Sequence, residues 1–253
     1  MIATVGVDLP ERWASHPLVV TESAHHAWDA SHAWWDDDAL LLRLRRLAAT
    51  EPDGYGVYGV GSPDAVARLV LAAGDLAPVG RTTVPRGTRA ALARLTAAVP
   101  APFDRPAQAH WDWLMTDRAP ADLPGQERVE ELTGRAGLRE AAATLGVAHP
   151  EGELAVGEPR SRWWGWRDDD GVLRGVVGAD RRVPGAPWVL GSVGTDPAWR
   201  RRGVAAATTA VAVRAGLAEA PIVTLGMYAD NDAARRTYAR VGFVVVQANE
   251  SSR

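Results

Sequence analysis

Apolar residues gather in short blocks along this chain, and the blocks after residue 180 are the clearest to interpret. Trp188–Val193 is a short apolar run with a proline close on either side, which predicts a buried strand. Ala205–Ala218 is rich in Ala, Val and Leu, and it predicts a helix that follows this strand. Pro221–Met227 is a second apolar run and predicts another strand. The C-terminal half therefore alternates strands and helices.

Similar patterns predict further elements. Arg162–Arg167 and Val172–Val177 flank Asp168-Asp-Asp-Gly171, a turn signal between two strand-like runs, and they predict a hairpin. The other predicted strands are Gly54–Val60, Trp111–Met115 and Phe243–Gln247, and the other predicted helices are Leu40–Ala49, Pro63–Ala73, Glu127–Leu132 and Leu138–Leu145. The proline-rich stretch Pro100–Pro106 is the expected linker, so the predicted domains are residues 1–107 and 108–253.

Composition narrows the class of protein. The chain has 253 residues, of which 47% are hydrophobic, so it is long and apolar enough for one large or two small globular domains. The net charge is −3 without a long basic block, so we expect no nucleic-acid partner. No apolar run reaches the ~18 residues of a membrane helix, and Met1–Pro10 lacks the pattern of a leader peptide. We expect a soluble cytoplasmic protein without a membrane partner.

Two residue types are absent from the sequence. There is no cysteine, which excludes a disulfide framework, a thiolate zinc site and an acyl-cysteine intermediate. There is also no lysine, since all 28 basic residues are arginine. A Walker-type phosphate loop needs a lysine, so a P-loop NTPase is excluded.

The turn between the strand Trp188–Val193 and the next helix has the features of an anion site. The first turn of a helix has unpaired backbone N–H groups and the positive end of the helix dipole. Gly203 allows a phosphate to approach the backbone, and Ala205 is nearly as small. Arg200, Arg201 and Arg202 add positive charge beside it.

A second set of polar residues lies on the helix predicted after Met227. Asn231 or Asp230 can cap its start, and Gly242 is suited to end it. Seven residues at ~100° each bring Tyr238 nearly over Asn231, with Arg235 between them. One face of this helix therefore carries Asn, Arg and Tyr.

With both motifs in place, the chain resembles the GNAT superfamily of acetyl-CoA-dependent N-acetyltransferases. The family motif Arg/Gln-x-x-Gly-x-Gly/Ala is matched by Arg200-x-x-Gly203-x-Ala205, and its later motif is matched by Asn231, Tyr238 and Gly242-Phe243. The resemblance implies an α/β (α+β) fold with a mixed central β-sheet flanked by helices. It also implies direct transfer of an acetyl group from acetyl-CoA to an amine of an unidentified acceptor, in a ternary complex.

The resemblance also implies roles for individual residues. Tyr238 would donate a proton to the leaving CoA thiolate, which a phenol of pKa around 10 can do. The backbone of Val193, Gly194 and Thr195 would pair with the pantetheine arm, and Asn231 and Arg235 would contact the CoA arm. The remaining cofactor-binding residues form the diphosphate turn: Arg200, Arg201, Arg202, Gly203, Val204, Ala205 and Ala206. No metal is implied.

Several points stay open at this level. The strand before Asn231 has no carboxylate to act as general base, and Glu158, Asp180 and His149 are equally weak candidates. An acyl-CoA-binding sensor or pseudoenzyme without transferase activity is therefore the alternative. Another donor, such as succinyl- or malonyl-CoA, is compatible with the motifs. The acceptor and the oligomeric state are not predicted.

Residues 1–107 lack both motifs. They are interpreted as a degenerate second copy of the same domain or as an unrelated cap, and in neither case are they expected to bind acetyl-CoA. Val84-Pro-Arg-Gly-Thr88 precedes a helical run at a place comparable to that of the diphosphate turn, although the resemblance is faint.

Two groups of residues have competing interpretations. His25, Asp29 and His32, with His26 and Asp36-Asp-Asp38 close by, would share one face of a helix and could ligate a metal, but a polar surface is favoured. On a strand, Trp164 and Trp166 share one face and Trp163 lies on the other. Core packing is favoured for the tryptophans over the wall of an acceptor pocket.

Overall fold

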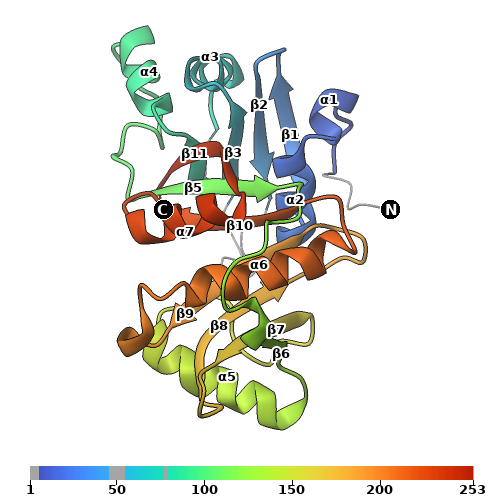
Figure 1. Ribbon diagram of the computed structural model, residues 1–253. Helices are drawn as coiled ribbons and strands as arrows, with labels where there is room; N and C mark the ends of the chain where they lie inside the picture. The colour runs from blue at the N-terminus through green and yellow to red at the C-terminus, as the bar shows by residue number, and fades with distance from the viewer. Residues whose placement is uncertain (1–5, 46–54, 77–78, 253) are drawn as a thin grey trace. The chain divides into compact units, whose positions relative to one another are not determined.

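The computed structural model describes residues 6–45, 55–76 and 79–252, which cluster into two compact units (Figure 1). The first unit comprises Met1–Trp113, Tyr228–Asp230 and Val245–Arg253, and the second comprises Leu114–Met227 and Asn231–Val244. The chain therefore leaves the first unit after Trp113 and returns to it twice, at Tyr228–Asp230 and from Val245 onward.

The first unit is a mixed sheet with helices packed on it. Its strands follow the order β1-β2-β3-β4-β11-β5, in which β5 and β11 each extend into the second unit. The strands are β1 (Ala30–Trp35), β2 (Ala39–Leu44), β3 (Tyr55–Gly61), β4 (Val79–Pro85), β5 (Ala109–Thr116) and β11 (Val244–Ser252), and the helices are α1 (Glu11–Ala14), α2 (Pro17–His26), α3 (Pro63–Ala73) and α4 (Thr88–Leu95). Val66 of α3 and Leu92 of α4 share a buried cluster with Leu41 and Val57 of the sheet.

The second unit has helices on both faces of its strands. The strands are β6 (Val129–Glu131), β7 (Ser161–Arg167), β8 (Leu173–Asp180), β9 (Trp188–Thr195) and β10 (Val223–Tyr228), in the order β10-β9-β8-β7-β6, and the helices are α5 (Gly134–Ala148), α6 (Val204–Leu217) and α7 (Asp232–Val241), with short 3-10 helices at Gln126–Arg128 and Pro197–Trp199. Helix α5 covers one face and α6 the other (Figure 1).

The three tryptophans of β7 confirm this layering. Trp163 is buried in a cluster with Leu145 of α5, whereas Trp164 is buried in the cluster that contains Ala210 of α6. Trp166 is buried against Val204 and Ala207 of α6. The predicted alternation of faces and the core-packing interpretation are therefore both confirmed.

The two units repeat one connection pattern. In the second unit β7, β8 and β9 are antiparallel neighbours, α6 follows, and β10 is parallel to β9 before α7 begins. In the first unit β1, β2 and β3 are antiparallel neighbours, α3 follows, and β4 is parallel to β3 before α4 begins. Each unit is thus a mixed sheet flanked by helices, which confirms the predicted fold class.

This repeat corrects one comparison made from the sequence. Helix α3 occupies the position of α6, so the segment comparable to the turn before α6 is Gly61-Ser62, before α3. Val84–Thr88 precedes α4, the counterpart of α7, and its proposed equivalence to the diphosphate turn was wrong.

The helix predicted for Leu40–Ala49 was wrong over the residues that the structure describes there. Residues 40–44 belong to β2, which pairs with β1 on one side and β3 on the other, and residues 46–49 lie outside the described part of the chain. Leucine favours helices by propensity, but Leu40, Leu41 and Leu42 are all fully buried. A strand covered on both faces has no need for polar alternation, so its pattern resembles that of a buried helix.

The helix predicted for Glu127–Leu132 was also wrong. A short 3-10 helix ends at Arg128, and Val129–Glu131 pairs with β7 as the edge strand β6. Glu130 lies 2.6 Å from the Arg167 guanidinium of β7, and Glu131 lies 2.7 Å from Arg162. These cross-strand ion pairs favour the strand over a helix for a sequence rich in glutamate.

The histidines of the N-terminal region do not form the predicted metal-binding helix face. Helix α2 ends at His26 and His32 lies on β1, so His25, Asp29 and His32 do not share a helix face, and that prediction was wrong. Within the described residues no group of three or more acidic or histidine side chains could hold a metal ion.

No helix in the described part of the chain combines the length and apolar character required to span a membrane. The cytoplasmic location stays a prediction.

The last strand is longer than predicted and completes the first unit. β11 runs to Ser252 and pairs antiparallel with β4. The buried Glu250 carboxylate accepts hydrogen bonds from the backbone N–H groups of Gly87 (3.2 Å) and Arg89 (2.8 Å), at the start of α4. It also lies 3.4 Å from the Arg89 guanidinium. A cut at residue 107 would therefore separate β11 from the strand and the helix that it stabilises.

We predict that Glu250→Ala lowers the free energy of unfolding by about 3 kcal/mol, because it removes the carboxylate that neutralises the Arg89 guanidinium and that accepts from two backbone N–H groups at the start of α4. Urea denaturation followed by circular dichroism measures the loss. Arg94→Ala is the matched control, because its ion pair with Asp64 joins side chains that are 64% and 65% exposed. The control should cost less than about 0.5 kcal/mol. Equal losses in the two variants would contradict the role given to Glu250.

Candidate functional site

The parallel pairing of β9 with β10 stops part-way along both strands. It comprises three residue pairs, from Trp188 opposite Val223 to Leu190 opposite Leu225. Both strands continue beyond this ladder, β9 to Thr195 and β10 to Tyr228. Backbone groups of β9 after Leu190 that would have faced β10 can therefore pair with an extended ligand.

A β-bulge in β9 accompanies this separation. Gly191 pairs with Gly178 and Gly194 pairs with Val176, so β9 uses one more residue than β8 over the same stretch. Ser192 has a left-handed φ of 51°, and its Oγ exchanges hydrogen bonds of 2.9 Å with the backbone N–H and C=O of Leu154. A bulge bends the strand that carries it. This bulge was not predicted from the sequence, although the glycines on either side of Ser192-Val193 were its signal.

The turn after β9 is held by two of its three arginines. The Arg200 guanidinium donates hydrogen bonds to the carbonyl oxygens of Thr195 (3.3 Å) and Ala148 (3.2 Å), which ties the turn to the ends of β9 and α5. The Arg202 guanidinium lies 4.6 Å from the centre of the Trp199 ring. Arg201 is exposed. The backbone of Arg200 is extended (φ −63°, ψ 156°), whereas Arg201 (φ 63°) and Gly203 (φ 84°) are left-handed.

Helix α6 begins without a side-chain cap. Gly203 is its N-cap, and the first N–H that bonds back to the Gly203 carbonyl is that of Ala207 (2.9 Å). The N–H groups of Val204, Ala205 and Ala206 therefore remain as donors at the positive end of the helix dipole. A Cβ placed on Gly203 would meet nothing within 4 Å, so there is open space at this helix end.

One more polar atom beside the turn lacks a partner. The Thr195 Oγ1 atom is buried and makes no hydrogen bond. The open helix end and this unpaired hydroxyl fit a ligand with a phosphate group next to a polar chain.

Helix α7 begins and ends where the sequence predicts. The Asn231 side-chain oxygen accepts a hydrogen bond from the Ala234 N–H (3.0 Å), and Gly242 ends the helix with a φ of 102°. Because the side-chain oxygen of Asn231 caps the helix, the NH2 group of the same side-chain amide can donate a hydrogen bond to a ligand. Arg235 is half-buried on the same helix.

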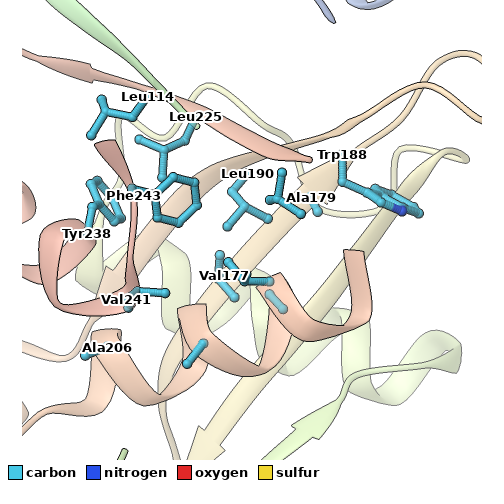
Figure 2. Close-up of a cluster of buried hydrophobic side chains, with 14 of the residues drawn as sticks. Leu114, Val177, Ala179, Trp188, Leu190, Ala206, Leu225, Tyr238, Val241 and Phe243 are labelled. Atoms are coloured by element: carbon cyan, nitrogen blue, oxygen red, sulfur yellow. The ribbon is translucent and has the colours of Figure 1, made fainter. Parts of the chain in front are cut away.

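Tyr238 lies at one end of the core of the second unit (Figure 2). It is 8% exposed, and its ring packs edge-on against Phe243 with 5.9 Å between the ring centres. The same cluster contains Ala206 in the first turn of α6, with Val193 of β9 packed against it. Burial raises the pKa of Tyr238 to about 12, so its phenol is protonated throughout the neutral range.

Comparison with known proteins identifies this part of the chain. Residues 127–243 match the model of the acetyltransferase (GNAT) family. This segment belongs to the GNAT family. It contains β9, the turn, α6 and α7, and therefore every cofactor-binding and catalytic residue predicted from the sequence.

Solved structures give weaker matches that extend over more of the chain. A Drosophila protein is 16% identical, with a TM-score of 0.51 over 84% of this chain and 78% of its own. A GNAT-family acetyltransferase from Colwellia psychrerythraea is 12% identical, with a TM-score of 0.49 over 97% and 90%. A tandem GNAT protein from the clavulanic acid biosynthesis pathway is 15% identical, with a TM-score of 0.41 over 85% and 78%. The search of curated proteins gave no match.

The three candidates for a general base are distributed around the GNAT domain. Asp180, at the end of β8, lies 3.6 Å from the Arg182 guanidinium. His149 is the C-cap of α5, and Glu158 is an exposed residue before β7. We find no contact that favours one of them, and the base stays unassigned.

We predict that Tyr238 is still neutral when ordinary tyrosines ionise. Because the chain has no lysine or cysteine, tyrosines are the side chains that titrate between about pH 9 and pH 12. Tyrosinate absorbance should rise along the same curve in the wild type and in Tyr238→Phe up to pH ~11. A tyrosinate with a pKa near ~10 that disappears in the variant would contradict the burial of this phenol.

The same shift predicts how stability depends on pH. Above pH ~10 the unfolded chain loses the Tyr238 proton while the folded chain keeps it, so the free energy of unfolding decreases as pH rises from ~10 to ~12. In Tyr238→Phe this part of the decrease should be absent, which urea denaturation across that range measures.

Proposed function

We propose that the protein is an acetyl-CoA-dependent N-acetyltransferase that transfers an acetyl group directly from the thioester to an amine. The observation that carries this proposal is the uncapped N-terminus of α6 beside the interrupted β9–β10 ladder. Membership of residues 127–243 in the GNAT family supports the reaction class.

The turn and β9 would hold the two parts of CoA in different ways. The N–H groups of Val204, Ala205 and Ala206, with the residues from Arg200 to Gly203, would bind the diphosphate. The backbone of Val193, Gly194 and Thr195 would pair with the amides of the pantetheine arm, because these residues of β9 do not pair with β10. Asn231 and Arg235 would contact the CoA arm from α7.

Acetyl-CoA supplies an activated thioester carbonyl. The neutral amine forms a C–N bond to this carbon, the C–S bond breaks, and the electron pair leaves on sulfur. Tyr238 would donate its proton to that sulfur, and burial keeps it protonated for this step because its pKa is about 12. The proton that the amine loses passes to water or to the unassigned base.

We assign one acetyl-CoA to each chain. In the first unit the N-terminus of α3, the counterpart of α6, has donors that the protein itself satisfies. The Ser62 side chain accepts the Ala65 N–H (3.3 Å), and Pro63 has no N–H to offer. The Gly61 N–H donates to Gln247 Oε1 (3.1 Å). A Cβ at Gly61 would lie 2.1 Å from the Asp38 carbonyl oxygen, so the backbone before α3 is closely packed.

The alternative is an acyl-CoA sensor or pseudoenzyme, favoured by the lack of a carboxylate in β10. The two functions differ in one measurement, which is the release of free thiol from acetyl-CoA across a panel of amines. A transferase releases thiol with at least one class of amine, whereas a sensor binds acetyl-CoA and releases none.

We predict that Gly203→Asp weakens acetyl-CoA binding roughly 100-fold, or about 3 kcal/mol, because the carboxylate repels the diphosphate. Isothermal titration calorimetry measures the change. Gly171→Asp is the matched control, since Gly171 also has a left-handed φ (76°) and open space around it, in the β7–β8 turn. If both variants bind acetyl-CoA like the wild type, the turn before α6 is not the diphosphate site.

We predict that Tyr238→Phe lowers kcat by roughly 100-fold, with little change in the KM for acetyl-CoA, because only the proton donor is removed. The variant keeps the ring that packs on Phe243, so its stability at neutral pH serves as the control. An unchanged kcat between pH 6 and pH 9 would leave Tyr238 with a packing role alone.

A further inference from the structure

A second concave site lies at the other end of β9. It is a pocket of about 520 Å³, within the range of small-molecule sites. Its charged and aromatic lining consists of Arg160, Arg162, Arg181, Arg182, Trp188 and Glu219, and we call it the arginine pocket. All of these residues belong to the second unit.

Two of the arginines are fixed in position and face one carboxylate. The Arg162 and Arg181 guanidinium groups each lie 2.7 Å from an oxygen of Glu219. Both also lie over the Trp188 ring, at 5.6 Å and 4.4 Å from its centre. Stacking and ion pairing hold the two guanidinium groups so that they converge on a single anionic group. The Glu219 carboxylate occupies the position that an external anion would take.

The charges of the arginine pocket do not cancel. Its lining has four arginines and one carboxylate. Two carboxylates outside the lining pair with these arginines, Glu131 with Arg162 (2.7 Å) and Asp180 with Arg182 (3.6 Å). Four cations and three anions leave an excess of positive charge. Because each guanidinium has five N–H donors, Arg181, Arg182 and the exposed Arg160 can still bind an anion.

The arginine pocket is far from the turn proposed for CoA. Trp188 begins β9, and Thr195, which precedes the turn, ends it. Seven residue steps of ~3.3 Å separate Trp188 from Thr195, a distance of about 23 Å. Figure 2 shows Trp188 and Tyr238 at opposite ends of the buried cluster. In addition, the buried Nε1 of Trp188 has no hydrogen-bond partner.

We propose that the arginine pocket binds a small anion with two or more negative charges, such as a phosphorylated or polycarboxylate metabolite, separately from acetyl-CoA. One anionic group would bind between Arg162 and Arg181 in competition with Glu219, and the other would bind Arg160 and Arg182. This site does not depend on the proposed function, because none of its residues belongs to the predicted CoA site.

Calorimetric titration of the full chain with inorganic pyrophosphate, and separately with citrate, tests this proposal. CoA is added at saturation so that the turn before α6 does not bind the probe. Arg181→Gln should weaken the binding of the preferred anion at least tenfold. Glu219→Gln should tighten it several-fold, because it removes the competing carboxylate but keeps the shape. Arg139→Gln is the control, an exposed arginine that lines a different hollow on α5, and it should bind like the wild type.

Opposite effects of Arg181→Gln and Glu219→Gln would not arise from a general loss of stability, and circular dichroism checks that each variant is folded. Should Arg181→Gln not fold, the exposed Arg160→Gln takes its place. Binding of neither probe, or binding that all these variants share, would overturn the proposal. Failure of CoA itself to bind would contradict the proposed function but leave the comparison of variants valid. The probe that binds more tightly, pyrophosphate or citrate, shows whether the pocket prefers phosphate or carboxylate groups.

Discussion

The bulge at Ser192 is the local constraint on which the candidate site depends. An unbroken β9 would pair with β10 to its end and leave no backbone groups for a ligand. The extra residue in β9, held by the two hydrogen bonds between the Ser192 side chain and the Leu154 backbone, coincides with the end of that pairing. The segment from Ser192 to Thr195 then leads into a turn that Arg200 ties to the same strand. The strand, the turn and the start of α6 therefore act as one preorganised surface.

The two units have the same connection pattern, but the backbone N–H groups at the start of α3 and of its counterpart α6 differ in their partners. At the start of α3 the Ser62 side chain accepts the Ala65 N–H and Pro63 has no N–H, while Gln247 accepts the Gly61 N–H just before it. Gly203 leaves the donors of α6 without any side-chain partner. An unsatisfied helix end costs stability unless water or a ligand pairs with it. The difference between the two units is thus a matter of a few side chains at one turn rather than of topology.

Sequence patterns predicted those features that local chemistry determines. Gly203, Asn231 and Gly242 mark helix ends through backbone conformation and capping, and the structure has each of them at its expected position. The errors occurred where partners distant in sequence decide the outcome. Leu40–Leu44 is a strand because of its neighbours β1 and β3, and Glu130-Glu131 because of arginines more than 30 residues later. The arginine pocket likewise joins the ends of β7, β8 and α6, so no single segment of the sequence predicts it.

The position of β11 in the sequence determines which of the two units has all of its strands first during synthesis. β4 pairs with residues 249–252, and the Glu250 carboxylate caps the start of α4, more than 150 residues after α4 in the sequence. Domains generally fold from the N-terminus as the ribosome releases them. Here the second unit, whose last residue is Val244, emerges in full before the first unit has its final strand. Until residues 249–252 have been synthesised, β4 has an open edge on which another strand can pair.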